Sequence, residues 1–224
     1  MAKPTTKSVS KPTEPAGNSP EKRAAGTAVT AATITTAELI NRGFMYWTIA
    51  VAGCAADLIS KEAIFAWRGL PQPENEYWLV QGYVGIETSL NRGALFGMGA
   101  GYSSLFAVLS VTAITGIMVW LFAYRAAADR LLTVILAMIT GGILGNLYDR
   151  LGLWSQDLPA ELAEYRYAVR DWILLRYKQH TWPNFNIADC LLVIGAGLMM
   201  YQSFRTSDKE EPLAASPKQD AAAK

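Results

Sequence analysis

Two long stretches of this chain contain no charged residue, and they limit its possible folds more than any other feature. Residues 102–123 and 131–148 are uncharged over 22 and 18 positions. A helix needs about 20 mainly apolar residues to cross a bilayer core, so both predict membrane spans. Neither has the polar face of a helix in a soluble domain. Two weaker apolar stretches, at 43–59 and 187–204, are each interrupted by an aspartate. Together they predict an all-α polytopic membrane protein with four transmembrane helices.

Composition excludes several classes of function. The formal net charge is +1, and there is no basic stripe with interleaved aromatic residues, so we expect no nucleic-acid partner. Cys54 and Cys190 lie in apolar stretches without metal-ligand spacing, and the single histidine, His180, is isolated. We therefore expect no metal ion and no cofactor.

Polar, low-complexity sequence lies at both ends of the chain. Residues 1–40 are rich in Lys, Pro, Thr, Ala and Ser, and residues 206–224 repeat this character. Both predict disordered tails around a four-helix membrane domain at 41–205. Arg125 and Arg130 frame a short turn on the same side as the basic tails. Because cytoplasmic flanks carry an excess of Lys and Arg, we expect both termini in the cytoplasm.

The two longer connections between the apolar segments carry weaker signals. Segment 71–100 alternates at period two, with flanking Gly and Pro, which favours a small extracytoplasmic β-hairpin. Segment 157–169 has Pro159 at the first turn of a possible short helix. We expect it to form a surface helix above the membrane.

Most of the remaining polar residues fall at one end of the predicted helices. Helices 1 and 3 run outward and helix 4 runs inward, so two C-terminal ends and one N-terminal end share the outer membrane face. The polar residues expected there are Asp57, Lys61, Asn91, Gly93, Asn146, Asp149, Arg150, Asp171, Asn186 and Asp189. Ionisable residues in membrane segments are costly and indicate function by default. Asp149 also sits at the negative end of its helix dipole, so it needs an arginine or backbone donor as a partner.

Two of these carboxylates, Asp171 and Asp189, have no obvious cation at helical spacing. The aromatic segment between them, 172–187, can fold back and bring them together. Two close carboxylates cannot both ionise cheaply, so one keeps a proton. The ionised member can then activate a water while the protonated one donates to the attacked carbonyl, as in aspartic proteases. Alternatively, Arg170 or Arg176 neutralises Asp171, and Asp189 only caps the last helix.

Five short motifs, read in order, resemble one family. They are DLISK (57–61), NRGALFG (91–97), GNLYDR (145–150), VRDWI (169–173) and NFNIAD (184–189). Each motif alone is weak, but the five together on four apolar segments resemble the lipoprotein signal peptidases (signal peptidase II) across residues 42–205.

The resemblance implies a hydrolase of the bacterial cytoplasmic (inner) membrane, a four-helix intramembrane aspartyl protease. Such an endopeptidase removes the signal peptide of diacylglyceryl-modified prolipoproteins, cutting just before the lipidated Cys. The resemblance implies that Asp171 and Asp189 are the catalytic pair. It implies substrate-binding or site-supporting roles for Asn91, Gly93, Asn146, Arg150, Asn186, Asp57 and Lys61. Lipidated prolipoproteins and membrane lipid are then the partners, and we expect a monomer.

The chain departs from the family pattern in three places. Trp172 stands where Phe is common, Cys190 where Ser is usual, and the stretch between Arg150 and Asp171 is longer than typical. A competing hypothesis is a non-enzymatic small polytopic membrane protein whose outer polar cluster binds a ligand. A rhomboid-like serine site would need GxSG and a presenilin-type site GxGD, and the sequence has neither.

Overall fold

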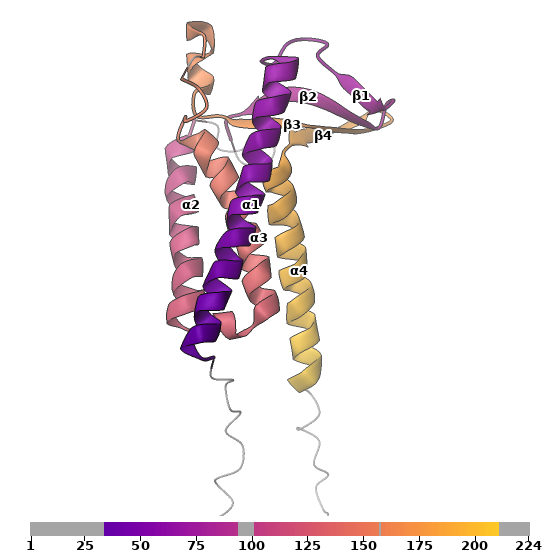
Figure 1. Cartoon of the computed structure of the whole chain (residues 1–224). Helices are drawn as coiled ribbons and strands as arrows, with labels where there is room; N and C mark the ends of the chain where they lie inside the picture. Colours follow the sequence, from indigo (N-terminus) through magenta and orange to yellow (C-terminus); the bar gives the residue numbers. More distant parts are fainter. Residues whose placement is uncertain (1–33, 94–100, 157, 211–224) are drawn as a thin grey trace, which may run out of the picture. The chain divides into compact units, whose positions relative to one another are not determined.

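The computed structural model describes residues 34–93, 101–156 and 158–210, with side chains to residue 205 (Figure 1). The elements in chain order are α1 (Thr36–Arg68), β1 (Tyr77–Val80), β2 (Val84–Asn91), α2 (Ser103–Met118), the π-helix η3 (Val119–Ala123), the 3₁₀ helix η4 (Ala126–Ala128), α3 (Arg130–Arg150), the 3₁₀ helix η5 (Ala160–Tyr165), β3 (Val169–Tyr177), β4 (His180–Phe185) and α4 (Ile187–Glu210). The long elements are helices, as the apolar stretches predicted.

Three helices in the described part of the chain are long and apolar enough to cross a membrane. They are Ser103–Ala123, which joins α2 to η3, then α3, and α4 as far as Arg205. The fourth predicted helix is present as α1, but it is not among these three. Its second half carries Asp57, Lys61 and Glu62, and such charges lower its apolar character.

The predicted tail boundaries differ from the helix ends. α1 begins at Thr36 because Thr35 caps it: the Thr35 side chain accepts the Glu38 backbone N–H, and the Glu38 carboxylate accepts the Thr35 backbone N–H. α4 continues to Glu210, past the expected end at residue 205. The remaining parts of the predicted tails, 1–33 and 211–224, lie outside the described residues.

Helix α3 packs against α1, α2 and α4. Glycines on α3 allow two of these close approaches. A Cβ added at Gly141 would lie 2.9 Å from the Ala50 carbonyl oxygen of α1, and one at Gly142 would lie 2.5 Å from the Ala188 carbonyl oxygen of α4. Small residues let helix backbones touch, as is common between membrane helices. α3 therefore holds α1 and α4 at backbone contact.

A small apolar core fills the end of the helices near the α2–α3 turn. A buried hydrogen bond between the Tyr46 hydroxyl and the Thr140 hydroxyl, 2.7 Å long, crosses from α1 to α3 beside this core. The buried core residues are Tyr46, Leu121, Ala127, Leu136 and Ala137. The core at this end of the bundle is thus apolar, and the buried Tyr46 and Thr140 hydroxyls satisfy each other.

A four-stranded antiparallel sheet lies at the opposite end of the helices, in the order β1-β2-β3-β4 (Figure 1). The predicted hairpin in 71–100 is present as β1–β2. A second hairpin, β3–β4, was not predicted: the segment read as a connecting loop from 172 to 187 is mostly strand. In the pairing between β2 and β3, Ser89 of β2 lies opposite Asp171 of β3. The sheet therefore carries Asp171 as a strand residue.

The predicted surface helix at 157–169 is realised differently. Only Ala160–Tyr165 is helical, as the 3₁₀ helix η5, and Val169 already belongs to β3. The Trp154 indole N–H donates to the Ala168 carbonyl oxygen at 3.1 Å, which holds the chain extended where it enters the strand. The start of α1 and the end of α4 lie at the end away from the sheet (Figure 1).

Candidate active site

The sheet end of the helices collects the predicted polar residues from five elements. Asp57 and Lys61 come from the second half of α1, and Asn91 ends β2. Asn146, Asp149 and Arg150 occupy the last turns of α3; Asp171 lies on β3; Asn186 and Asp189 begin α4. The alternating directions of successive helices predicted that these residues would meet at one end, and the packing confirms it.

Asn186 bridges the two aspartates. Its side-chain amide donates to Asp171 Oδ1 at 2.6 Å. Its side-chain oxygen accepts the Asp189 backbone N–H at 2.9 Å, and its own backbone N–H donates to Asp189 Oδ2 at 3.2 Å. The reciprocal bonds make Asn186 and Asp189 an N-terminal cap of α4. The cap therefore fixes the position of the Asp189 carboxyl group. Through the Asn186 side chain it also links Asp189 to Asp171.

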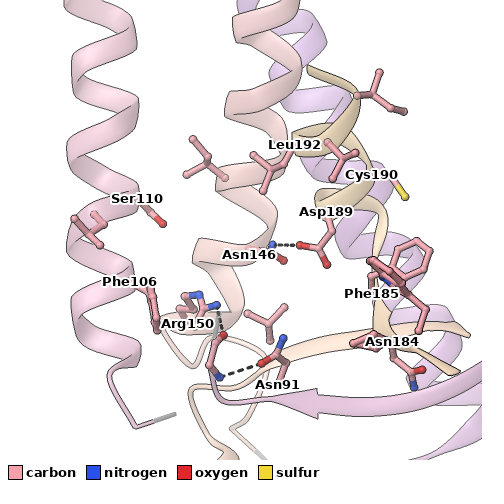
Figure 2. Close-up of a pocket in the computed structure, with 18 of the residues that line it drawn as sticks. Asn91, Phe106, Ser110, Asn146, Arg150, Asn184, Phe185, Asp189, Cys190 and Leu192 are labelled. Carbon is pink, nitrogen blue, oxygen red and sulfur yellow. Dashed lines mark hydrogen bonds between the residues drawn. The ribbon is translucent and has the colours of Figure 1, made fainter. Parts of the chain in front are cut away.

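Lys61 orients a second amide toward Asp189. The ammonium is fully buried and lies 3.1 Å from Asn146 Oδ1. Because Lys has only donors, it selects the oxygen end of the Asn146 amide. The nitrogen end then donates to Asp189 Oδ1 at 2.9 Å (Figure 2). Lys61 also pairs with Asp57, four residues earlier on α1, at 2.6 Å and with Asp149 of α3 at 3.1 Å, so its ion pairs join two helices.

The environment of Asp171 favours its protonated form. Only 2% of the residue is exposed. Burial raises the pKa of the Asp171 carboxyl to about 8, and the negative charge of Asp189 adds to this rise. Hydrogen bonds from Asn186 and Asn91 oppose it. The positive charge of Lys61 also opposes it, but the balance favours the protonated form of Asp171, while the Asp189 carboxyl accepts two N–H donors.

Neither neighbouring arginine neutralises Asp171. Arg170 pairs with Asp149 and with Glu62 of α1. Arg176 pairs with Glu76. Among the residues described by the structure, no ion pair joins a cation to Asp171, so that part of the alternative reading is wrong. Asp189 does cap α4, but it also accepts the Asn146 amide.

Asp149 has the partners that its position on the helix requires. Arg170 donates to Asp149 Oδ1 through Nε at 3.2 Å and through Nη2 at 3.0 Å. The Arg170 backbone N–H donates to Asp149 Oδ2 at 3.0 Å. Asp149 is fully buried, and both an arginine and a backbone donor satisfy it.

A cavity of about 790 Å³ opens beside this network, between the sheet and α2, α3 and α4 (Figure 2). Its polar wall includes Asn91, Asn146, Arg150 and Asp189. Most of its remaining wall is apolar. Asp171 is not among the residues that line it, but Asn91 both lines the cavity and hydrogen-bonds Asp171.

Arg150 binds the segment that follows β2, at Gly93. Its Nη2 donates to the Gly93 carbonyl oxygen at 2.8 Å, and its guanidinium lies 4.7 Å from the centroid of the Phe106 ring (Figure 2). The Gly93 backbone N–H donates to Asn91 Oδ1 at 3.0 Å. These contacts place Asn91 and Gly93 at the cavity wall, next to the polar network.

The family model described as "Signal peptidase (SPase) II" matches residues 49–205. This chain belongs to the lipoprotein signal peptidase family.

Relatives with that name cover most of the chain. The lipoprotein signal peptidase of Rhodopirellula baltica is 53% identical over 165 residues, which are 73% of each chain. That of Aquifex aeolicus is 30% identical and is aligned over 73% of this chain and 87% of its own. A solved structure of a bacterial membrane enzyme, 21% identical, superposes with a TM-score of 0.62 over 77% of this chain and 95% of its own, which shows the same fold.

Sequence reasoning missed the apolar half of the site in this family member. Phe106 and Ser110 of α2, and Trp182 and Phe185 of β4, line the cavity. The α2 residues lie in an uninterrupted apolar run, where no pattern separates a cavity wall from a lipid-facing surface. Phe185 lies within the NFNIAD motif, but the motif gave it no role, and Trp182 lies outside all five motifs. The residues that the motifs assigned to the site were polar residues and one glycine.

Proposed function

We propose that this member of the lipoprotein signal peptidase family is an aspartyl endopeptidase. It removes the signal peptide from diacylglyceryl-modified prolipoproteins and cuts just before the lipidated Cys. The single observation that carries the proposal is the Asn186 bridge between Asp171 and Asp189, with a pKa for Asp171 of about 8. Two carboxyl groups that share one proton are the working unit of aspartic proteases.

In the proposed mechanism the two aspartates divide the proton transfers. Ionised Asp189 faces the cavity and removes a proton from a water molecule that attacks the scissile carbonyl carbon. Asp171 is buried just behind the cavity wall and hydrogen-bonds Asn91, which lines the cavity. In the proposed mechanism the bound substrate brings its carbonyl oxygen within reach of Asp171, which donates its proton and gives a gem-diol. Asp189 then passes the water proton to the amide nitrogen and Asp171 takes a proton back from a gem-diol hydroxyl, so the C–N bond breaks to leave a carboxylic acid and a free amine. The pair titrates as a coupled unit, so neither role is an independent property of one carboxyl.

The cavity has an apolar part and a polar part, which suit the lipid and the peptide of the substrate. Its apolar wall, formed by α2, α3 and α4, which are long and apolar enough to span a membrane, together with residues of β3 and β4, suits acyl chains and an apolar signal peptide. Its polar end, with Asn91, Asn146 and Arg150, suits the peptide backbone around the cleavage site. We infer that the lipidated Cys lies near the boundary between them.

Asparagine variants of the two aspartates test the proposal. Asp171→Asn and Asp189→Asn should each lower kcat for a diacylglyceryl-modified prolipoprotein by about 10²- to 10⁴-fold, because each removes a proton-transfer group. Asp129→Asn is the matched control, since Asp129 caps α3 at the other end of the bundle and Asn caps equally well. Near wild-type cleavage by either active-site variant, in protein of unchanged thermal stability, would overturn the dyad assignment.

The substrate claim has its own test. The unlipidated precursor should be cleaved much more slowly than the lipidated one, because it leaves the apolar part of the cavity unfilled. Equal kcat/KM for the two precursors would indicate a general membrane protease instead. Binding without any cleavage would favour the non-enzymatic alternative.

The proposal includes α1 as a fourth membrane helix, with both termini in the cytoplasm. Asp57 and Lys61, its central charges, are fully buried and paired with each other, which reduces their cost in a membrane. The proposed peptidase domain, 41–205, works as a monomer. A fluorescent protein that folds only in the cytoplasm should fluoresce when fused after residue 210. Absence of fluorescence, with the fusion still membrane-inserted, would contradict the orientation.

A further inference from the structure

Arg170 precedes Asp171 on β3 and is almost completely buried, with 3% exposed. Its guanidinium is enclosed by aromatic rings, with its carbon 5.3 Å from the Trp154 centroid and 5.9 Å from the Phe65 centroid. It reaches acidic side chains on two helices: buried Asp149 of α3 through two nitrogens, and Glu62 of α1, whose side chain is 77% exposed, through Nη1 at 3.1 Å. One side chain therefore ties β3 to both α1 and α3.

The main chain of Arg170 is fixed as well. Its N–H donates to Asp149 Oδ2 at 3.0 Å, and its carbonyl oxygen accepts the Asn186 side-chain amide at 3.4 Å. That same amide holds Asp171 Oδ1 at 2.6 Å. The position of Asp171 relative to α4 therefore depends on where Arg170 holds the strand.

The charge balance of the buried network also links Arg170 to the two aspartates. Asp149 is fully buried and shared between Lys61 and Arg170. Without Arg170, Lys61 alone would have to balance Asp149 and Asp57. Lys61 also orients Asn146, which donates to Asp189. A change at Arg170 would therefore reach both aspartates, one through the strand and one through the lysine.

We propose that Arg170 is a positioning residue for the aspartyl pair, anchoring Asp171 to α3 through the buried Asp149, with the exposed Glu62 of α1 as a weaker second contact. It does not touch the cavity: it is not among the cavity-lining residues of the described chain. It acts on catalysis through Asp171 and not through substrate. This inference rests on the proposed peptidase function. The motifs in the sequence gave Arg170 no role in the site; it was considered only as a residue that could neutralise Asp171.

The test separates positioning from general stability by steady-state kinetics. In Arg170→Gln, kcat for the lipidated precursor should fall about 10- to 100-fold, the effect of a displacement near 1 Å at a reacting group. KM should stay within about threefold, because no substrate contact is removed. Arg170→Lys should recover part of kcat, since it keeps the charge but lacks the planar fork that meets Asp149 through two nitrogens.

Arg176→Gln is the matched control. Arg176 lies on the same strand and pairs with Glu76, but both partners of that pair are partly exposed. Its kcat should stay within about twofold of wild type, as expected for a solvent-accessible pair. Thermal unfolding in detergent is recorded for every variant, and Arg170→Lys carries the test if Arg170→Gln does not fold.

The outcomes distinguish this inference from the proposed function. If the wild type cleaves the lipidated precursor and Arg170→Gln keeps its kcat, the positioning role is wrong and the peptidase function stands. A loss in Arg176→Gln equal to that in Arg170→Gln would also overturn it, because any strand arginine would then do. If the wild type itself does not cleave, the proposed function fails first.

Discussion

A methyl group added at Gly142 would disturb the proposed dyad without altering a polar residue. Gly142 of α3 faces the Ala188 carbonyl oxygen of α4, and a Cβ placed there would be 2.5 Å from that oxygen. Ordinary contact begins at 3.4 Å, so the backbones of α3 and α4 must separate by about 0.9 Å. Ala188 immediately precedes Asp189, and Asn146 lies one turn beyond Gly142. The displacement therefore falls on the Asn146–Asp189 hydrogen bond.

The expected size follows from two opposed effects. Overpacking of a close contact costs about 1–3 kcal/mol, whereas Gly→Ala within a helix gains about 1 kcal/mol from helix propensity. The net loss of stability should thus be small. The 2.9 Å bond from Asn146 to Asp189 would lengthen beyond hydrogen-bonding distance if it took up the whole shift. A displacement of this size near the reacting groups is worth about 10²-fold in rate.

The assay compares Gly142→Ala with Gly197→Ala by cleavage of the lipidated precursor and by thermal unfolding in detergent. A Cβ at Gly197 of α4 would meet nothing within 4 Å, so this control receives the same chemical change without a contact. We expect kcat to fall about 100-fold in Gly142→Ala and to stay unchanged in Gly197→Ala. If Gly142→Ala cleaves at the control rate, the α3–α4 contact does not set the dyad geometry and the reasoning is wrong.

Three further predictions follow from the same network. Because the proposed mechanism needs a proton on Asp171, kcat/KM should decline as pH rises through about 8, and a flat profile would contradict the assignment. Folding takes up that proton, so the free energy of unfolding should also decline as pH rises from about 4 toward 8; a constant value would count against the raised pKa of Asp171. Lys61→Met leaves buried Asp57 without a cation and leaves Asp149 with Arg170 alone, so it should cost about 3–5 kcal/mol in unfolding experiments, unlike exposed Lys178→Met. Thr35→Ala removes the α1 cap and should cost about 1 kcal/mol with unchanged kcat; a loss of activity would show that the start of α1 reaches the site.

Much of the architecture could be read from short-range patterns. Apolar length identified the helices because the bilayer sets a minimum span, and charge-free runs at 102–123 and 131–148 meet it. Parity then grouped Asp57, Asn146 and Asp189 at one end, since alternating helices must alternate direction. The motifs pointed to the same residues by resemblance. These inferences need only the order of residues along the chain.

The sheet was predicted only in part, for a physical reason. The β1–β2 hairpin could be predicted because its sequence alternates at period two between turn residues. In β3, by contrast, three consecutive residues are buried: Val169, Arg170 and Asp171. A strand covered on both faces loses the period of two, so the pattern resembles a loop or a buried helix end. Asp171 could therefore be named from its motif but not placed on a strand.

The choice of ionic partners was open until the fold was known. From sequence alone, Arg170 was as available to Asp171 as to Asp149, because adjacency on the chain says nothing about which way two successive strand side chains point. In the folded protein they point to opposite faces, so Arg170 meets Asp149 and Asp171 meets Asn186.

Sequence determined that this chain forms long apolar helices with a polar cluster at one end, because hydrophobic length and helix direction are local properties. Only the tertiary structure decided that Asn186 joins Asp171 to Asp189, that Lys61 turns Asn146 toward the second aspartate, and that an apolar cavity opens beside them. Each of these depends on groups from different elements meeting within about 3 Å, and hydrogen bonds at that range are set by packing.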